Sequence, residues 1–269
     1  MESTLFGTVR LGTLPDSFQR FAVIYGGLAS GATAGILAVG PSQDYPGSAL
    51  RPAASAQFPA GFPSMADRGV RAAALFEQRV YLGGSFLRAG EVPVYHIAGF
   101  DGERVHQLGT GVDGVVNTLS HFGARLIVGG GFSKAYQPLV ESTDGSGQIG
   151  GVLESGGLVA WEGGRWALVG GEVLQGFVSC SFVAGETLYI GGRFSAPGRE
   201  NNLAFFAGGK WASMCDAAGV CGVTGGEVHA LTAFGEDLYI GGSFTSAGSV
   251  PVQVPFPASN VVFRFHSAY

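Results

Sequence analysis

A short apolar phrase that ends in two glycines and, two positions later, a phenylalanine occurs four times along the chain. The first glycines of successive copies lie 46, 62 and 50 residues apart. The residues before each glycine pair are aliphatic or aromatic, as suits a half-buried strand. A period near 50 built on such strands is typical of repeated small sheets and predicts a β-propeller. The copies are Val80-Tyr-Leu-Gly-Gly-Ser-Phe86, Leu126-Ile-Val-Gly-Gly-Gly-Phe132, Leu188-Tyr-Ile-Gly-Gly-Arg-Phe194 and Leu238-Tyr-Ile-Gly-Gly-Ser-Phe244.

Further apolar runs flank each phrase, so one repeat is predicted to hold four short strands. Glycine-containing turns separate the third strand from the fourth, as in tight hairpins. The paired glycines are expected where neighbouring sheets converge, and the phenylalanine is expected in the core between them. The predicted lead-in strands are 70–75, 116–119, 178–182 and 228–231, the third strands are 96–100, 158–161, 203–206 and 261–265, and the fourth are 105–108, 166–169 and one opening at Trp211.

The fourth copy, Leu238-Tyr-Ile-Gly-Gly-Ser-Phe-Thr-Ser-Ala-Gly248, resembles kelch-type repeats. It is similar to the propeller of fungal cortical polarity-marker proteins and to bacterial surface propellers, over roughly residues 69–269. The resemblance implies an all-β propeller fold. Because propellers host enzymes, adhesins and scaffolds alike, it implies no catalytic residue.

Composition supports a turn-rich folded domain. The chain has 47 glycines, 20 phenylalanines and only 13% charged residues, whereas disordered chains are highly charged and poor in aromatic residues. A net charge of −5 leaves no basic surface for nucleic acid, so we expect no nucleic-acid partner.

Residues 21–40 contain no charged side chain. As a helix they would span about 30 Å, the thickness of the hydrocarbon core of a bilayer. Gly27, Gly31 and Gly35 would share one helix face, where small residues allow a second membrane helix to pack closely. We therefore expect a single-pass transmembrane helix that binds the bilayer and other membrane-protein subunits.

Two other interpretations of this segment remain open. Ile24-Tyr-Gly-Gly27 can be read as a decayed fifth copy of the phrase, with 35–39 as its third strand. Alternatively, the segment is a secretory signal that ends at Ala38-Val-Gly40. The membrane helix is preferred to the fifth copy because five prolines in 41–69 would leave such a sheet without its outer half.

The fourth copy reaches only its third strand before Tyr269, and we expect Phe58-Pro-Ala-Gly61 to supply the missing outer strand. Phe58 lies 25 residues before Gly83, as Trp166 does before Gly191. The predicted fold is therefore a closed four-bladed propeller, with five blades as the alternative. The expected organisation is an N-terminal lead (1–20), the helix (21–40), a proline-rich tether (41–55) and the propeller (56–269).

Two insertions interrupt the period. Residues 134–156 form a long connection, and loops of this length are usually functional or disordered, so they are the candidate partner loop. In the second insertion, Cys215 and Cys221 could close a disulfide, which would indicate an oxidising compartment. Cys180 is expected to be a small core residue. The residues proposed for the partner contact are Tyr136, Gln137, Leu139 and Glu141.

No catalytic, metal-binding or cofactor motif is present in the sequence. The five histidines are scattered, and His229 occupies the position held by Arg71, Asn117 and Ser179 in the other copies. We expect a non-enzymatic, membrane-anchored accessory or scaffold subunit without cofactors, for example in an organelle inner membrane (mitochondrial or thylakoid). The alternatives are a surface adhesion or ligand-binding propeller and, third, a propeller enzyme with a site in its central channel.

Overall fold

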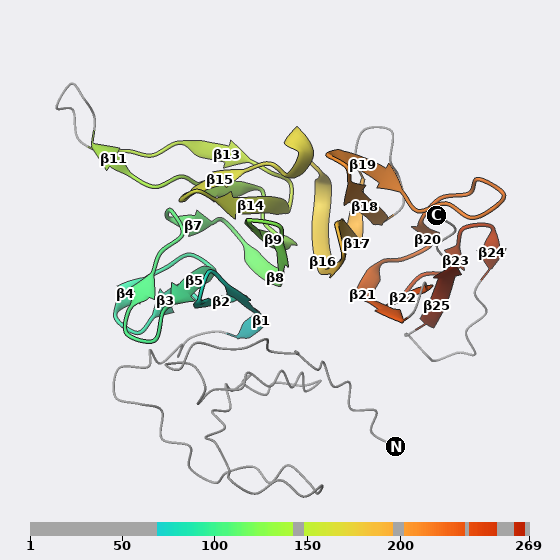
Figure 1. Ribbon diagram of the computed structural model, residues 1–269, viewed down its shortest axis with the longest axis horizontal. Helices are drawn as coiled ribbons and strands as arrows, with labels where there is room; N and C mark the ends of the chain where they lie inside the picture. The colour runs from blue at the N-terminus through green and yellow to red at the C-terminus, as the bar shows by residue number, and fades with distance from the viewer. Residues whose placement is uncertain (1–68, 142–147, 196–201, 235–236, 252–260, 267–269) are drawn as a thin grey trace, which may run out of the picture.

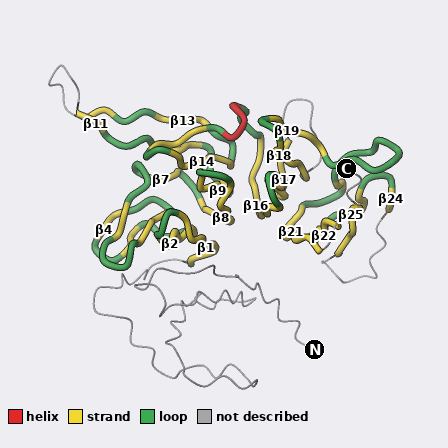
Figure 2. The backbone as a smooth tube through the Cα atoms, in the orientation of Figure 1, coloured by secondary structure: helices red, strands yellow, loops and turns green. Residues whose placement is uncertain are grey.

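The computed structural model describes residues 69–141, 148–195, 202–234, 237–251 and 261–266 (Figure 1). Within these ranges the chain is all β, and its only helical element is the 3-10 turn η2 (Val169–Gly171; Figure 2). No helix in these ranges is long and apolar enough to cross a membrane. The membrane helix expected at 21–40, the tether at 41–55 and the closing strand at 58–61 lie outside the described residues.

Four antiparallel sheets follow one another along the chain, and in each the hydrogen-bonded order of the strands is their order in the sequence. Sheet 1 contains β1 (Val70–Phe76), β2 (Arg79–Gly84), β5 (Ile97–Phe100) and β6 (Val105–His106). Sheet 2 contains β8 (Val115–Phe122), β9 (Arg125–Gly131), β14 (Leu158–Glu162) and β15 (Arg165–Ala167). Sheet 3 contains β16 (Gln175–Ala184), β17 (Thr187–Ser195), β18 (Leu203–Ala207) and β19 (Lys210–Ser213). Sheet 4 contains β21 (Val228–Phe234), β22 (Asp237–Gly242) and β25 (Val261–His266).

Smaller sheets lie on the connections that follow the glycine phrase. They are the hairpin of β3 (Arg88–Ala89) and β4 (Val92–Pro93), the sheet of β7 (Gly111–Val112), β10 (Lys134–Tyr136) and β13 (Val152–Glu154), the pair β11 (Val140–Glu141) and β12 (Gln148–Ile149), and the sheet of β20 (Val223–Thr224), β23 (Ser246–Ala247) and β24 (Val250–Pro251). The segment 134–156, expected as a loop, therefore contains strands.

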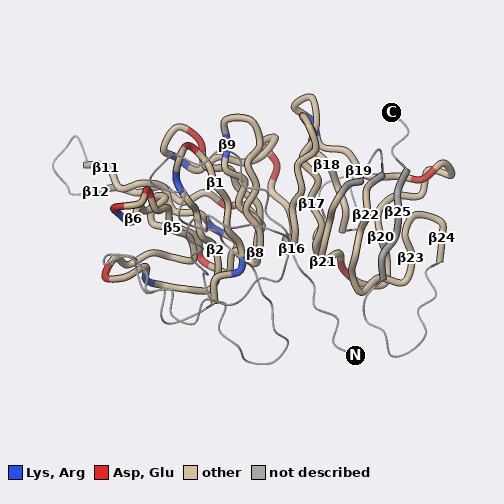
Figure 3. Tube along the Cα trace, turned by 60° about the horizontal axis from the view of Figure 1, so that its bottom comes forward, with Lys and Arg blue, Asp and Glu red and all other residues tan. Residues whose placement is uncertain are grey.

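The first strands of the four sheets pack side by side: β1 against β8, β8 against β16, and β16 against β21. The sheets consequently fan out in an arc with these strands on its inner side (Figure 1). Within the described part of the chain, β21 does not pack in this way against β1, and the two lie at opposite ends of the arc. Figure 3 shows that Lys, Arg, Asp and Glu gather mainly toward turns and connections, which leaves the apolar strands between the sheets largely free of charge.

The first glycine of the phrase makes the contact between sheets possible. A Cβ at Gly83 would lie 2.3 Å from Cγ1 of Val116, and one at Gly191 would lie 2.5 Å from Cγ1 of Val228. Each of these valines opens the inner strand of the next sheet and is fully buried. The glycine thus removes a side chain where two backbones must approach closely, as the sequence predicted.

The second glycine is required within its own sheet. A Cβ at Gly130 would lie 2.0 Å from the carbonyl oxygen of Val115 on the neighbouring strand. The N–H of the second glycine donates to the residue that precedes the third strand, which has a left-handed backbone (φ between 66° and 97°). These bonds are Gly84 to His96 (3.0 Å), Gly130 to Gly157 (2.9 Å) and Gly192 to Asn202 (3.1 Å).

Aromatic residues fill the wider space farther from the inner strands. Trp166 is buried, and its indole N–H donates to the carbonyl oxygen of Leu108 in the connection after sheet 1 (3.1 Å). Trp211 repeats the contact one sheet later, with Val169 (2.8 Å). The phenylalanines of the phrase are buried as predicted: Phe86, Phe132, Phe194 and Phe244.

Candidate functional site

A row of polar side chains follows the inner side of the arc, at one equivalent position on each innermost strand. The ladder between the first two strands of every sheet has a β-bulge one residue after the lead-in valine. Bulges commonly re-aim a side chain near functional sites. The bulged residues are Arg71, Asn117, Ser179 and His229, which the sequence alignment had already placed together.

Hydrogen bonds link this row from sheet to sheet. Nη1 of Arg71 donates to Oδ1 of Asn117 (3.0 Å), and Nδ2 of Asn117 donates to the carbonyl oxygen of Val178 (3.2 Å). At the far end, Nε2 of His229 lies 3.5 Å from Oε1 of Glu227. The side chain of Asn117 is thus occupied in joining three sheets, which favours a structural role for the middle of the row.

Hydroxyl groups connect the inner strands β8 and β16. Oγ of Ser181 lies 2.8 Å from Oγ1 of Thr118 and 2.6 Å from Oγ of Ser120. The N–H of Ser181 also donates to Thr118 Oγ1 (3.1 Å). These hydroxyls satisfy one another, and none lies beside a histidine or carboxylate that could activate it as a nucleophile.

The segment 134–154 forms an arm that projects from sheet 2 (Figure 1). At its base, β10 pairs with both β13 and β7, and farther out β11 pairs with β12. Three apolar side chains on the arm are largely exposed: Leu139 (51%), Val140 (62%) and Val152 (54%). Exposed apolar side chains clustered on one feature are typical of a protein-interaction site.

The proposed partner residues have different positions on this arm. The amide of Gln137 is used within the fold: Nε2 donates to the Trp166 carbonyl oxygen (2.8 Å), and Oε1 accepts from the Trp166 N–H (2.9 Å). Tyr136 is half-buried at the base, and Leu139 is exposed. Glu141 lies in β11, and its side chain is outside the described part of the structure.

A hollow of about 520 Å³ lies at the foot of the arm, lined by Tyr95, His96, Thr110, Val112, Asp113 and Tyr136. The carboxylate of Asp113 accepts bonds from the N–H and Oγ of Ser133 (both 2.7 Å) and the N–H of Lys134 (2.8 Å). Partial burial alone would raise the pKa of Asp113, but these donors hold the pKa below its ordinary value. The carboxylate is therefore a fixed anion that secures the arm, rather than the simply solvated turn residue that we expected.

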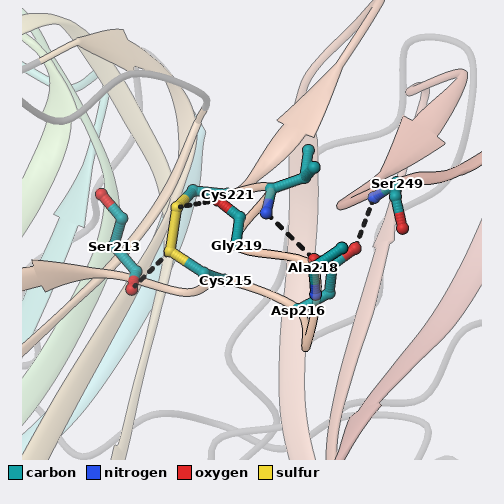
Figure 4. Close-up of a disulfide and its surroundings, with 8 residues drawn as sticks. Ser213, Cys215, Asp216, Ala218, Gly219, Cys221 and Ser249 are labelled. Carbon is teal, nitrogen blue, oxygen red and sulfur yellow. Dashed lines mark hydrogen bonds between the residues drawn. A yellow bond between two sulfur atoms is a disulfide. The ribbon is translucent and has the colours of Figure 1, made fainter.

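Cys215 and Cys221 are joined by a disulfide that closes the connection after β19 (Figure 4). Inside this loop, Oδ1 of Asp216 accepts from the N–H groups of Ala218 and Val220 (both 3.0 Å), and Oδ2 accepts from the N–H of Ser249 near β24 (2.6 Å). The bond from Ser249 and those from the loop lower the pKa of Asp216 to about 2. The remaining cysteine, Cys180, lies in β16, where burial raises its thiol pKa to about 12.

The helix-packing residues Gly27, Gly31 and Gly35 lie outside the described residues. Among the residues that the structure does describe, no three His, Cys, Asp or Glu side chains form a group able to hold a metal ion. Sequence reasoning aligned the bulged residues but gave no signal for the bulge, because an extra residue in a strand leaves the apolar pattern around it almost unchanged.

No protein-family model matches the chain, and no curated protein matches it either.

Proposed function

We propose that the chain is a non-catalytic β-propeller module that acts as an accessory subunit by binding another protein chain through the arm of residues 134–154. The repeated sheets and their adjacent inner strands support the propeller assignment, with the sheets as blades. The exposed apolar group of Leu139, Val140 and Val152 carries the binding proposal.

The arm is held firmly enough to present these side chains. Asp113 fixes its start through three hydrogen bonds, and Gln137 ties it to the backbone of Trp166 on both sides of its amide. An arm fixed before binding loses less conformational entropy when the partner docks. Its occupant is expected to be an apolar protein surface, because the three exposed anchors are aliphatic.

The test compares the full chain with the double variant Leu139→Ser/Val152→Ser in extracts of the cells that make it, by native electrophoresis and size-exclusion chromatography. Full burial of each aliphatic side chain contributes about 1.5–3 kcal/mol, so the double variant should weaken the complex by at least about tenfold. The matched control is Val220→Ser, because Val220 is an exposed valine (42%) on the disulfide loop, away from the arm.

The proposal holds if wild type and the Val220 variant migrate with a larger assembly and the arm variant migrates alone. It is wrong if the arm variant stays in the assembly, or if the wild-type chain migrates alone.

A further inference from the structure

Each junction between sheets uses the same pair of surfaces. We call the side of a sheet that faces the next repeat its trailing face and the opposite side its leading face. At all three junctions a glycine on the trailing face receives a valine from the leading face of the following sheet. The pairs are Gly83 with Val116, Gly129 with Val178, and Gly191 with Val228.

The two ends of the arc carry the same surfaces in a less covered state. On the leading face of sheet 1, Val70 and Val80 are half-buried, whereas the valines and leucines at their equivalent positions in the other sheets are buried. On the trailing face of sheet 4, Tyr239 and Gly241 are half-buried, whereas their counterparts are buried. The counterparts are Val116, Val178, Val228, Leu126, Leu188 and Leu238 for the leading face, and Tyr81, Ile127, Tyr189, Gly83, Gly129 and Gly191 for the trailing face.

We propose that residues 1–68 supply a fifth copy of the repeat, which covers the leading face of sheet 1 and places Gly26 against Val70. The sequence Val23-Ile-Tyr-Gly-Gly27 matches the pattern of Leu126-Ile-Val-Gly-Gly130. Gly26 precedes Gly83 by 57 residues, which falls between the shortest and longest spacings of the four described copies. The segment is as long as one repeat and ends directly before Gly69.

Sheet 4 weakens the main objection to this assignment. The prolines of 41–69 disfavour an outer strand, but the described part of sheet 4 contains three strands rather than four. A repeat without an outer strand thus already exists in the molecule. Because the segment is covalently joined to β1, its effective concentration at the leading face exceeds that of a second copy of the chain.

The experiment is disulfide trapping in the full chain, in a Cys180→Ala background. The test pair is Gly26→Cys with Val70→Cys. The positive control is Gly83→Cys with Val116→Cys, where a Cβ at Gly83 would lie 2.9 Å from Cβ of Val116, close enough for a bridge after a small outward shift. The matched negative control is Gly31→Cys with Val70→Cys. A third pair, Gly241→Cys with Val70→Cys, reports a second copy of the chain.

We expect mild oxidation to remove both new thiols of the Gly26 pair within one chain, as for the Gly83 pair, while the Gly31 pair keeps both thiols. The inference is overturned if the Gly83 pair closes and the Gly26 pair does not. It is also overturned if the Gly241 pair gives a covalent dimer, since a second copy then occupies the face.

Membrane extraction provides an independent readout, because a segment folded into a sheet cannot also be a membrane helix. Alkaline carbonate should release the wild-type chain from membranes. Retention of the full chain in the membrane pellet would support the transmembrane helix and overturn the fifth repeat.

Discussion

Gly129 on β9 and Val178 on β16 are in such close contact that a Cβ at position 129 would lie 2.9 Å from Cγ1 of Val178. The same added carbon would lie 2.7 Å from Cγ2 of Thr118. Val178 is fully buried and β-branched, so it has little freedom to move aside. The junction between sheets 2 and 3 therefore depends on the absence of one side chain.

Gly129→Ala should lower the free energy of unfolding by about 1–3 kcal/mol, because overpacking forces neighbouring side chains and backbone to shift. Gly131→Ala is the matched control on the same strand, since a Cβ there meets no described atom within 4 Å. The control should stay within about 0.5 kcal/mol of wild type or be slightly more stable. Urea unfolding measures both, and equal midpoints for the two variants would contradict the packing argument.

Trp211→Phe should lower stability by about 1–3 kcal/mol because it leaves the buried carbonyl oxygen of Val169 without its indole donor. Trp161→Phe provides a comparison, since Trp161 is only half-buried and rests edge-on against Trp166. Thermal unfolding by circular dichroism should show the larger loss of Tm for the Trp211 variant. A larger loss for the Trp161 variant would count against the indole bond as the tie between sheets.

Reduction of the Cys215–Cys221 disulfide should lower stability by about 2 kcal/mol, the chain-entropy contribution of so short a loop. Thiol titration in denaturant should find one free thiol per chain before reduction, from Cys180, and three afterwards. The double variant Cys215→Ser/Cys221→Ser should reproduce the stability of the reduced protein. A count of three thiols in the unreduced protein from an oxidising compartment would refute the pairing.

Asp216 should make stability sensitive to acid. Its pKa falls from the ordinary 3.8 to about 2 in the folded chain, so its contribution is complete above about pH 4 and is lost as the pH falls toward 2. Asp113 changes in the same direction. Asp216→Asn should therefore flatten the fall in urea midpoint over this interval, whereas Asp216→Glu should retain part of it. An unchanged acid slope in the Asn variant would show that the carboxylate is not linked to folding.

The repeat, the strand order and the buried phenylalanines could be predicted because each depends on a local pattern that occurs four times. The bulges at Arg71 and its counterparts could not, since they arise from a register shift between strands. The arm was predicted as a loop because Val140 and Val152 belong to short strands that have one neighbour or lie at an edge, where the apolar pattern is brief. The hydrogen-bonded role of Gln137 likewise depends on Trp166, 29 residues away in sequence.

The contrast between a glycine at the inner strands and a tryptophan farther out makes each sheet a wedge. Neighbouring backbones nearly touch at Gly129 and Val178, while Trp166 and Trp211 fill the wider end of the gap. The angle of this wedge determines how many sheets complete a full turn. Curvature is thus encoded by a difference in side-chain volume between two positions of the repeat, and a larger residue at the glycine or a smaller one at the tryptophan would open the arc into a flatter assembly.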